Sequence, residues 1–335
     1  MKRDKSNLGW VFVAIAGISA AMLISCDENP LIEGDPLELK AVEVPVPLAR
    51  SSASVFVTGG NAYLVTGRDA VDQMLNDCHR YNPADGSWTE CDTLPSLRRV
   101  NGVAIGTEEY GYAGLGFNIA TNTYNAESQL RDWWRFNPSD GSWERKADFP
   151  ALATNGSISF VYEGRIYIGF GFDGWTFTRS MWCYDPDNDS WTGLAPPPVD
   201  IRAGAVVCTD GHRVFFGSGF KINDLNDWWE YFPGTDSWEV RTPQPGKGRH
   251  FGVGFSVGGR FFVATGRYFG GLLDDGFLHN NILEYEPDSD RWIDRGAMPG
   301  GGRQNAVAFV IGNKAYIGFG ENDTTILGDL WVFEP

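Results

Sequence analysis

The sequence predicts an all-β protein that folds as a six-bladed β-propeller. Six copies of one short motif recur along the chain, and each copy has an aromatic residue at the same place: Tyr81, Phe136, Tyr184, Tyr231, Tyr285 and Phe333. In the first five copies a polar turn and a tryptophan follow: Trp88, Trp143, Trp191, Trp238 and Trp292. A proline stands seven residues after each of these tryptophans, and the prolines are 47 to 55 residues apart. A repeat of this length, made of short strands and turns, is typical of propeller blades.

Each copy predicts the outer half of a blade, and the residues before it predict the inner half. An alternating apolar segment, a tight polar turn and an aromatic-led segment ending in glycine precede the motif, as in residues 160–171 and 309–320. Alternation with a period of two between turn residues indicates antiparallel hairpins. We therefore expect four antiparallel strands in each blade, named A to D from the inside outwards.

Adjacent tryptophans occur twice in the predicted strand C, at Trp133–Trp134 and at Trp228–Trp229. Successive residues of a strand point to opposite faces, and each blade lies between two others. We therefore expect the two neighbours to pack into different inter-blade layers. Eleven of the twelve tryptophans that follow residue 26 occupy strand C or D positions, so packing explains them. His79 replaces a tryptophan of strand C, and packing is expected for it as well.

The sixth copy ends at Pro335, directly after its strand C, so its strand D must come from elsewhere. Residues 37–50 alternate as a strand does. We expect this N-terminal strand to act as the outer strand of the last blade and to close the ring, which leaves no open edge there. Lys40 is expected at the place of the strand D tryptophan.

Taken together, the period near 50 residues, the four strands, the glycines after strand B and the tryptophan of strand D resemble the kelch repeat of β-propellers. The resemblance extends from about residue 37 to the end of the chain. The usual double glycine of that repeat is altered here to GFG, GSG or TGR. The expected fold is therefore a six-bladed kelch-type propeller, and we expect it to be monomeric.

The first residues predict export. Three basic residues precede an apolar run from about residue 8 to 24, and Leu-Ile-Ser then precedes Cys26. This order is that of a secretory signal, and the cysteine resembles the acylated residue of bacterial lipoproteins. The alternatives are a plain signal peptide or an N-terminal anchor helix. The lipoprotein interpretation divides the chain into a signal peptide (1–25), a lipidated tether (26–36) and the propeller (37–335). It also predicts that the protein is anchored to the outer membrane of a Gram-negative envelope.

Net charge and cysteines narrow the classes of partner. The chain has a formal net charge of −16, which argues against nucleic acid and against a basic membrane-binding face. No cysteine pair has metal-ligand spacing, and no cofactor motif is present. If Tyr81 faces Trp88 across a hairpin, then Cys78 faces Cys91, and we expect a disulfide there. Cys183 and Cys208 are expected to be buried free thiols.

Arginines directly before the predicted A strands are candidate ligand contacts: Arg99, Arg202, Arg249 and Arg303. Arg50 stands one place out of register in the first blade. The D–A and B–C connections of a propeller open on one face, which we call the D–A/B–C rim. In kelch domains that bind acidic ligands, arginines at this place contact carboxylates, and a planar guanidinium suits such bidentate bonding. The alternative is that these side chains cap carbonyl groups or pair with neighbouring acids.

Aromatic residues of the B–C connections are further candidates on this rim. Trp175 is the one tryptophan after residue 26 outside the packing positions, and an exposed indole could stack on a sugar or anchor a peptide. Tyr124 lies in the long B–C loop of blade two, and Tyr268 and Phe269 lie in that of blade five. Variable loops on a rigid scaffold are where recognition usually occurs.

Evidence for catalysis is thin, and His250 on the rim is the one candidate acid–base residue. Our first hypothesis is therefore an envelope lipoprotein that binds a partner, either an acidic protein segment or a glycan, through the D–A/B–C rim. The second hypothesis follows from resemblance. Kelch-type sialic acid mutarotases are similar in fold, which implies an N-acetylneuraminate epimerase activity at the channel mouth. A buried acid–base group beside the arginines would favour the second hypothesis, and the sequence offers no clear one.

Overall fold

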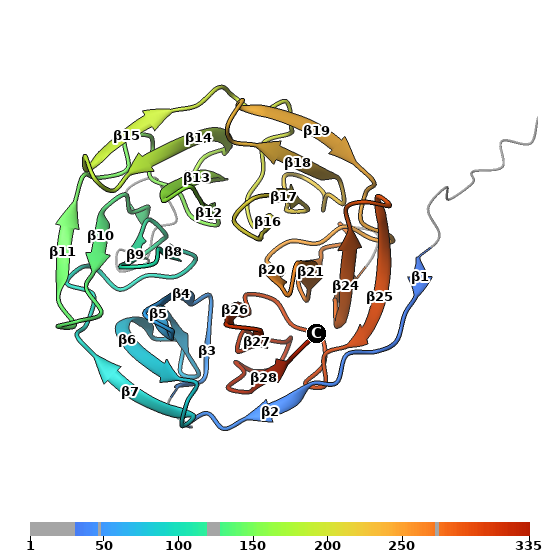
Figure 1. The fold of residues 1–335 in the computed structure, drawn as a ribbon, viewed down its shortest axis with the longest axis horizontal. Helices are drawn as coiled ribbons and strands as arrows, with labels where there is room; N and C mark the ends of the chain where they lie inside the picture. Colours follow the sequence, from blue (N-terminus) through green and yellow to red (C-terminus); the bar gives the residue numbers. More distant parts are fainter. Residues whose placement is uncertain (1–30, 46–47, 119–127, 272–274) are drawn as a thin grey trace, which may run out of the picture. The chain divides into compact units, whose positions relative to one another are not determined.

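A ring of six antiparallel sheets surrounds a central axis in the computed structural model, which describes residues 31–45, 48–118, 128–271 and 275–335 (Figure 1). Strand A of each blade lies innermost and strand D outermost (Figure 1). The predicted fold class, a six-bladed propeller with four antiparallel strands in each blade, is confirmed. In the described part of the chain, no helix has the length and apolar character needed to cross a membrane.

Strands follow the predicted order A to D in every blade. Blades one to three contain β4 (Ser54–Thr58), β5 (Asn61–Asp69), β6 (Met74–Asn82) and β7 (Ser87–Cys91); β8 (Val103–Gly106), β9 (Gly111–Gly114), β10 (Trp133–Phe136) and β11 (Trp143–Lys146); and β12 (Ile158–Tyr162), β13 (Arg165–Phe172), β14 (Phe177–Asp185) and β15 (Ser190–Gly193). Blades four to six contain β16 (Val206–Thr209), β17 (Val214–Gly217), β18 (Trp228–Phe232) and β19 (Ser237–Arg241); β20 (Val253–Val257), β21 (Arg260–Ala264), β24 (Asn281–Glu286) and β25 (Arg291–Ala297); and β26 (Val307–Ile311), β27 (Lys314–Gly318) and β28 (Leu330–Phe333). A small hairpin in the B–C connection of blade five is formed by β22 (Arg267–Tyr268) and β23 (Phe277–Leu278).

The N-terminal segment adds strands to three blades. Strand β2 (Lys40–Val42) runs antiparallel to β28, so it is the outer strand of blade six. Strand β3 (Arg50–Ser51) pairs with β5 of blade one. Strand β1 (Ile32–Glu33) pairs with β25 in parallel, and it runs along the outside of blade five (Figure 1). Residues 31–36, expected to be tether, therefore lie within the propeller unit, which extends from Leu31 to Pro335.

The register of blade six corrects one expectation. Lys40 lies opposite Val332, and continuing this register places Leu39 opposite Phe333. Leu39, rather than Lys40, therefore takes the place of the strand D tryptophan. Leu39 is half-buried against the core between blades five and six, whereas Lys40 is exposed. The apolar side chain faces the core because alternation along a strand decides which neighbour points inwards.

Large aromatic side chains fill the layers between blades, as the adjacent tryptophans predict. Trp228 packs into the layer between blades four and five, and Trp229 packs against the layer between blades three and four. Phe160 and Tyr167 of blade three stack with ring centroids 4.9 Å apart, and the edge of Tyr231 from blade four meets them. Offset and edge-to-face contacts of this kind add to the free energy of apolar burial.

The regular spacing of residues within each copy of the repeat has a second structural cause, which is a set of hydrogen bonds between neighbouring blades. In blades two, three and five the strand D indole donates to a carbonyl of the preceding blade, as Trp191 does to Ala147 at 2.9 Å. In blades three, four and five an aspartate of the C–D turn accepts both the strand C tyrosine hydroxyl and a backbone N–H of the preceding blade. In blade three, Asp189 accepts from Tyr184 at 2.7 Å and from the N–H of Ala147 at 2.9 Å. In blades two to five the motif thus joins a blade to the preceding one as well as filling the core.

Candidate functional site

The arginines before the A strands are buried, and each belongs to a repeated hydrogen-bond set. Arg202 donates to both carboxylate oxygens of Asp227 at 2.6 and 2.8 Å. Its remaining donors reach the carbonyls of Asp200 at 3.0 Å and Ser218 at 2.9 Å. The partner aspartate lies four residues before the aromatic residue of strand C. The same bidentate pair recurs in three other blades: Arg50 with Asp77, Arg99 with Asp132, and Arg303 with Asp329.

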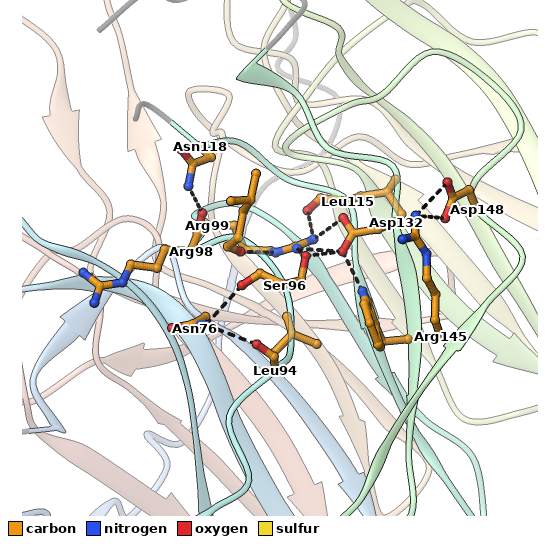
Figure 2. Close-up of polar contacts among 12 residues, drawn as sticks. Asn76, Leu94, Ser96, Arg98, Arg99, Leu115, Asn118, Asp132, Arg145 and Asp148 are labelled. Atoms are coloured by element: carbon orange, nitrogen blue, oxygen red, sulfur yellow. Dashed lines mark hydrogen bonds and ion pairs between the residues drawn. The ribbon is translucent and has the colours of Figure 1, made fainter. Parts of the chain in front are cut away.

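Figure 2 shows this Arg–Asp pair in blade two. The Arg99 guanidinium points at Asp132, while Ser96 and the carbonyl of Leu115 complete its hydrogen bonds. Asp132 also accepts the indole N–H of Trp134 at 2.6 Å. Every donor of the guanidinium is directed into the protein, and the side chain is 1% exposed.

These contacts overturn the expectation that the arginines form a ligand-binding ring. Arg99, Arg202, Arg249 and Arg303 are all buried, so none presents a free guanidinium at the channel mouth. Arg50 is in register with them, because it too bonds the carbonyl sixteen residues further along the chain, that of Thr66. The alternative interpretation, pairing with acids and carbonyls, is the one that the structure supports.

Histidine 79 has the structural role expected for it. Its ring bonds Asp77 at 2.8 Å, just as the indoles of Trp134, Trp229 and Trp331 bond the aspartate two residues before them. Burial opposes ionisation of Asp77, but hydrogen bonds from His79 and Arg50 lower the pKa of Asp77 to about 2. The carboxylate therefore stays charged at neutral pH and holds both partners.

Two blades depart from this pattern. Blade three has Thr154 and Ser180 at the two positions, so it lacks both members of the pair. Blade five keeps Arg249 but has Asn281 in place of the aspartate, and a single bond of 3.2 Å joins them. The Nε of Arg249 has no hydrogen-bond partner. Burial without a counter-charge lowers the pKa of Arg249 to about 9.

A closed ring of backbone hydrogen bonds surrounds the mouth of the channel. One residue from each D–A connection takes part, and all six have positive φ: Ser52, Asn101, Gly156, Gly204, Phe251 and Asn305. Each N–H donates to the carbonyl of the residue in the preceding blade at 2.8 to 3.2 Å. A cavity of about 190 Å³ lies here, and the Phe251 ring packs on Gly204 at its edge. The backbone polar groups of the mouth are therefore used within the ring.

His250 lies next to this ring and has a buried carboxylate partner that sequence reasoning missed. Its Nδ1 is hydrogen-bonded to Asp224, whose side chain is 1% exposed. The second oxygen of Asp224 accepts the N–H of Phe269 at 2.5 Å. Burial and then the nearby Arg249 lower the pKa of His279 to about 4, so His279 is neutral beside this pair. No spacing rule connects the two partners, because Asp224 stands in the B–C connection of blade four.

A cavity of about 280 Å³ adjoins the His250–Asp224 pair between blades four and five. Tyr268 and Phe269 line it, as does Lys247, whose Nζ lies 4.9 Å from the Tyr268 ring centre. Phe269 is exposed and Tyr268 is half-buried. The structure therefore brings these two candidates together with His250, and it keeps Trp175 apart from them on blade three. Tyr124 and Cys26 lie outside the described residues.

Trp175 is held on a rigid turn with its indole exposed. The buried carboxylate of Asp173 accepts the N–H groups of Trp175 and Thr176, both at 2.8 Å. The N–H of Asp173 in turn donates to the carbonyl of Thr176 at 3.1 Å. The indole remains 78% exposed, in agreement with the exposed interpretation. A buried acid thus orders the turn that presents this side chain.

Exposed arginines on the same rim escaped the sequence reasoning. Arg98, Arg131 and Arg179 are exposed, and within the described ranges their guanidinium groups have no hydrogen-bond or ion-pair partner. Figure 2 shows the Arg98 side chain directed away from the Arg99–Asp132 pair. Arg131 stands where blades one and four have Asn76 and Asn226, whose amides bond the D–A loop. The replacement of this asparagine by arginine is the feature of the sequence that could have predicted an exposed guanidinium here.

Two further arginines join blade six to its neighbours. Arg68 of blade one is hydrogen-bonded to Glu321, which also accepts from the side chains of Gln304 at 3.2 Å and Asn305 at 3.0 Å. Arg267 of blade five pairs with Asp323 at 2.7 Å. Both arginines follow a Thr-Gly dipeptide, so the TGR variant of the double glycine marks the two blades that flank the closing one.

The cysteines follow the predicted register. Cys78 and Cys91 are Cα partners across β6 and β7, and both are free thiols here, so their disulfide stays a prediction. Cys183 and Cys208 are buried and free. In the part of the chain that the structure describes, no group of three or more His, Cys, Asp and Glu side chains is placed to hold a metal ion.

Fold and repeat define the class of protein: this chain is a six-bladed β-propeller that contains a kelch motif. Residues 160–198, in blade three, match the family model described as the kelch motif. Among solved structures, one titled "Structure of YjhT" is similar with a TM-score of 0.73 and 18% sequence identity. The match covers 87% of this chain and 96% of that one. At this identity the likeness shows the fold alone. No curated protein matches the sequence.

Proposed function

We propose that this chain is a lipoprotein of a Gram-negative envelope, tethered through Cys26 to the outer membrane, whose monomeric propeller binds an acidic protein segment. The binding surface is the part of the D–A/B–C rim on blades two and three. We call it the basic rim, and it consists of Arg98, Arg131, Arg179 and Trp175. The observation that carries the proposal is the exposure of three arginines with no partner within the described residues, together with an exposed indole on blade three.

Unpaired guanidinium groups are unusual on this protein. With 43 acidic against 27 basic Lys and Arg residues, most cations of the described part lie near a carboxylate. An arginine that remains free can form two parallel bonds to a carboxylate of a partner, and each charge-assisted bond contributes about 1.5–3 kcal/mol. Arginine and tryptophan are also the residues that most often dominate the binding energy of interfaces.

Rigid presentation supports the same proposal. The Asp173 turn fixes the backbone that carries Trp175, so binding does not have to order that loop. Preorganisation of this kind raises affinity by lowering the entropic cost of association. Leu97 and Leu152, which are 58% and 72% exposed, stand in the D–A connections that lead into the same two blades. A partner with acidic and apolar side chains suits this surface better than a neutral glycan does.

The test uses a fluorescent peptide rich in Asp, Glu and Leu, with binding followed by anisotropy at low and physiological salt. We expect the combined change of Arg98, Arg131 and Arg179 to Glu to lower affinity at least about tenfold, because like charges then face each other. Arg165→Glu is the matched control, since Arg165 is exposed in an A–B turn on the opposite face. Equal loss in the control, or binding by glycans and not by the peptide, would reject the proposal.

A second candidate, a sugar mutarotase of the N-acetylneuraminate epimerase type, is favoured by the His250–Asp224 pair. A buried carboxylate that fixes a histidine ring is an arrangement used for proton transfer. The pair lies beside the channel mouth, where a sugar could reach it. NMR exchange of the N-acetylneuraminate anomers tests this candidate: His250→Gln should abolish any acceleration, while the basic-rim variant should retain it. No acceleration by the unmodified protein removes the candidate.

A further inference from the structure

The two cysteines of blade one form an asymmetric pair at the edge of the propeller. Cys78 is completely buried in the layer between blades one and two, beside Tyr63 and Val65. Cys91 is the last residue of β7, the outermost strand, and it is half-buried. The two residues are Cα partners. One thiol is therefore accessible from solvent, and the second lies directly behind it.

Charged and polar groups around Cys91 favour its thiolate. The Cys78 thiol is hydrogen-bonded to Cys91, and the Arg80 guanidinium of β6 is the positive group beside it. The Nε of Arg80 is buried and has no hydrogen-bond partner. The bond from Cys78, with help from Arg80 and against burial, lowers the pKa of Cys91 to about 7. The same bond and burial raise the pKa of Cys78 far above its usual range.

We propose that Cys91 is a redox-reactive thiolate site that undergoes thiol–disulfide exchange with a disulfide co-reactant and is then resolved by Cys78. In the first step the Cys91 sulfur attacks one sulfur of the co-reactant and releases the other as a thiolate. In the second step the Cys78 sulfur attacks the Cys91 sulfur, the Cys78 proton passes to the departing thiolate, and the second thiol is released. The two cysteines are oxidised by two electrons, and the co-reactant disulfide is reduced to two thiols.

Selectivity follows from the surroundings of the other thiols. Cys208 is fully buried and donates to the carbonyl of Phe262 at 3.1 Å, and burial raises its pKa to about 12. Burial likewise raises the pKa of Cys183. Neither is paired in register with another cysteine. Reactive cysteines are partly exposed and have positive neighbours, and among these four thiols Cys91 alone meets both conditions.

Oxidation would fix the strand end on which blade two is anchored. The carbonyl of Asp92, the residue after Cys91, accepts the indole N–H of Trp143 from blade two at 2.8 Å. A bond between Cys78 and Cys91 ties this end of β7 to β6. The redox state of the pair therefore acts on the link between blades one and two.

The test uses the reduced, purified full chain with glutathione disulfide near neutral pH, followed by mass spectrometry of peptides. We expect a Cys78–Cys91 crosslink, and in iodoacetamide labelling we expect Cys91 to react at least about tenfold faster than Cys183 and Cys208. Cys78→Ser should trap a stable glutathione adduct on Cys91, because the resolving thiol is gone. Cys183→Ser is the matched control and should leave crosslinking unchanged.

Arg80→Gln distinguishes a reactive thiolate from a purely structural cysteine pair. If Cys91 is reactive, its labelling should slow several-fold in this variant while the melting temperature stays similar. Cys26 lies in a separate peptide and is followed on its own. Equal labelling of Cys91, Cys183 and Cys208 in the folded wild-type protein would overturn the proposal. So would the absence of both the crosslink and the trapped adduct.

Discussion

Asn281→Asp should stabilise the protein, because it completes the one Arg–Asp pair that the repeat leaves half-made. Arg249 is buried, its Nε has no partner, and Asn281 offers it a single bond of 3.2 Å. In blade four the equivalent aspartate forms bonds of 2.6 and 2.8 Å with Arg202. The backbone positions correspond, so the introduced carboxylate can reach the guanidinium without a change of fold.

The size of the expected stabilisation follows from the counter-charge that is missing beside Arg249. Burial lowers its pKa from 12.5 to about 9, and at about 1.4 kcal/mol per pKa unit the uncompensated charge costs on the order of 5 kcal/mol at neutral pH. A charge-assisted bidentate pair recovers part of this, and we expect a gain of about 2 kcal/mol in the free energy of unfolding. For a propeller of this size the melting temperature should rise by about 3 °C.

The assay is thermal and urea unfolding of wild type, Asn281→Asp and the reciprocal variant Asp227→Asn, which gives blade four the pair of blade five. Asp227→Asn should cost about 3 kcal/mol, because it removes a charge from a buried pair. The gain from Asn281→Asp should be present above the ordinary pKa of an aspartate and fade on acidification, as the carboxylate takes up a proton. A neutral or destabilising Asn281→Asp, with a costly Asp227→Asn, would show that Arg249 has no need of a counter-charge.

Three further predictions concern other parts of the ring. Trp175→Ala should leave the melting temperature within about 1 °C of wild type, since the indole is 78% exposed. The same change should weaken acidic-peptide binding at least about tenfold. Val240→Ala, exposed on the outer edge of β19, is the control and should change neither the melting temperature nor the binding. Glu321→Gln should lower the free energy of unfolding by about 1 kcal/mol, measured by urea melts, because Arg68 of blade one loses its ion pair with blade six and keeps only the one with Asp72. An unchanged stability in low salt would contradict this role. The pKa of Asp77 is about 2 when folded and 3.8 otherwise, so about 2 kcal/mol of stability should be lost as pH falls from 4 to 2, and Asp77→Asn should remove that slope.

The sequence made the blades predictable because their cause is periodic. The aromatic residue and the tryptophan recur at fixed offsets, and Tyr81 lies opposite Trp88 as the hairpin arithmetic requires. The role of the arginines was harder to predict, because each partner aspartate is 25 to 33 residues further along the chain. A comparison of the copies contains the signal. Four of the five blades with the arginine have an aspartate four residues before the strand C aromatic residue, whereas blade three, with Thr154, has Ser180 there.

Residues outside the repeat could not be placed in this way. The His250–Asp224 pair joins a D–A connection to the B–C connection of another blade, and no offset within one copy relates them. Arg98 is exposed because its side chain points away from that of the adjacent Arg99, which is buried. Such features depend on three-dimensional packing, which pattern alone does not determine.

Breaks in the repeat coincide with two of the candidate contacts, Trp175 and His250. In a complete blade the aspartate binds an arginine and an indole or imidazole, so no polar group of that set remains for a ligand. Blade three lacks the pair and carries Trp175, and blade five has half of it and carries His250. Departures from local consistency are where function is expected, since elsewhere every choice supports the same fold. Four Arg–Asp pairs thus stabilise the scaffold, and the candidate contacts Trp175 and His250 lie on the two blades that lack a complete pair.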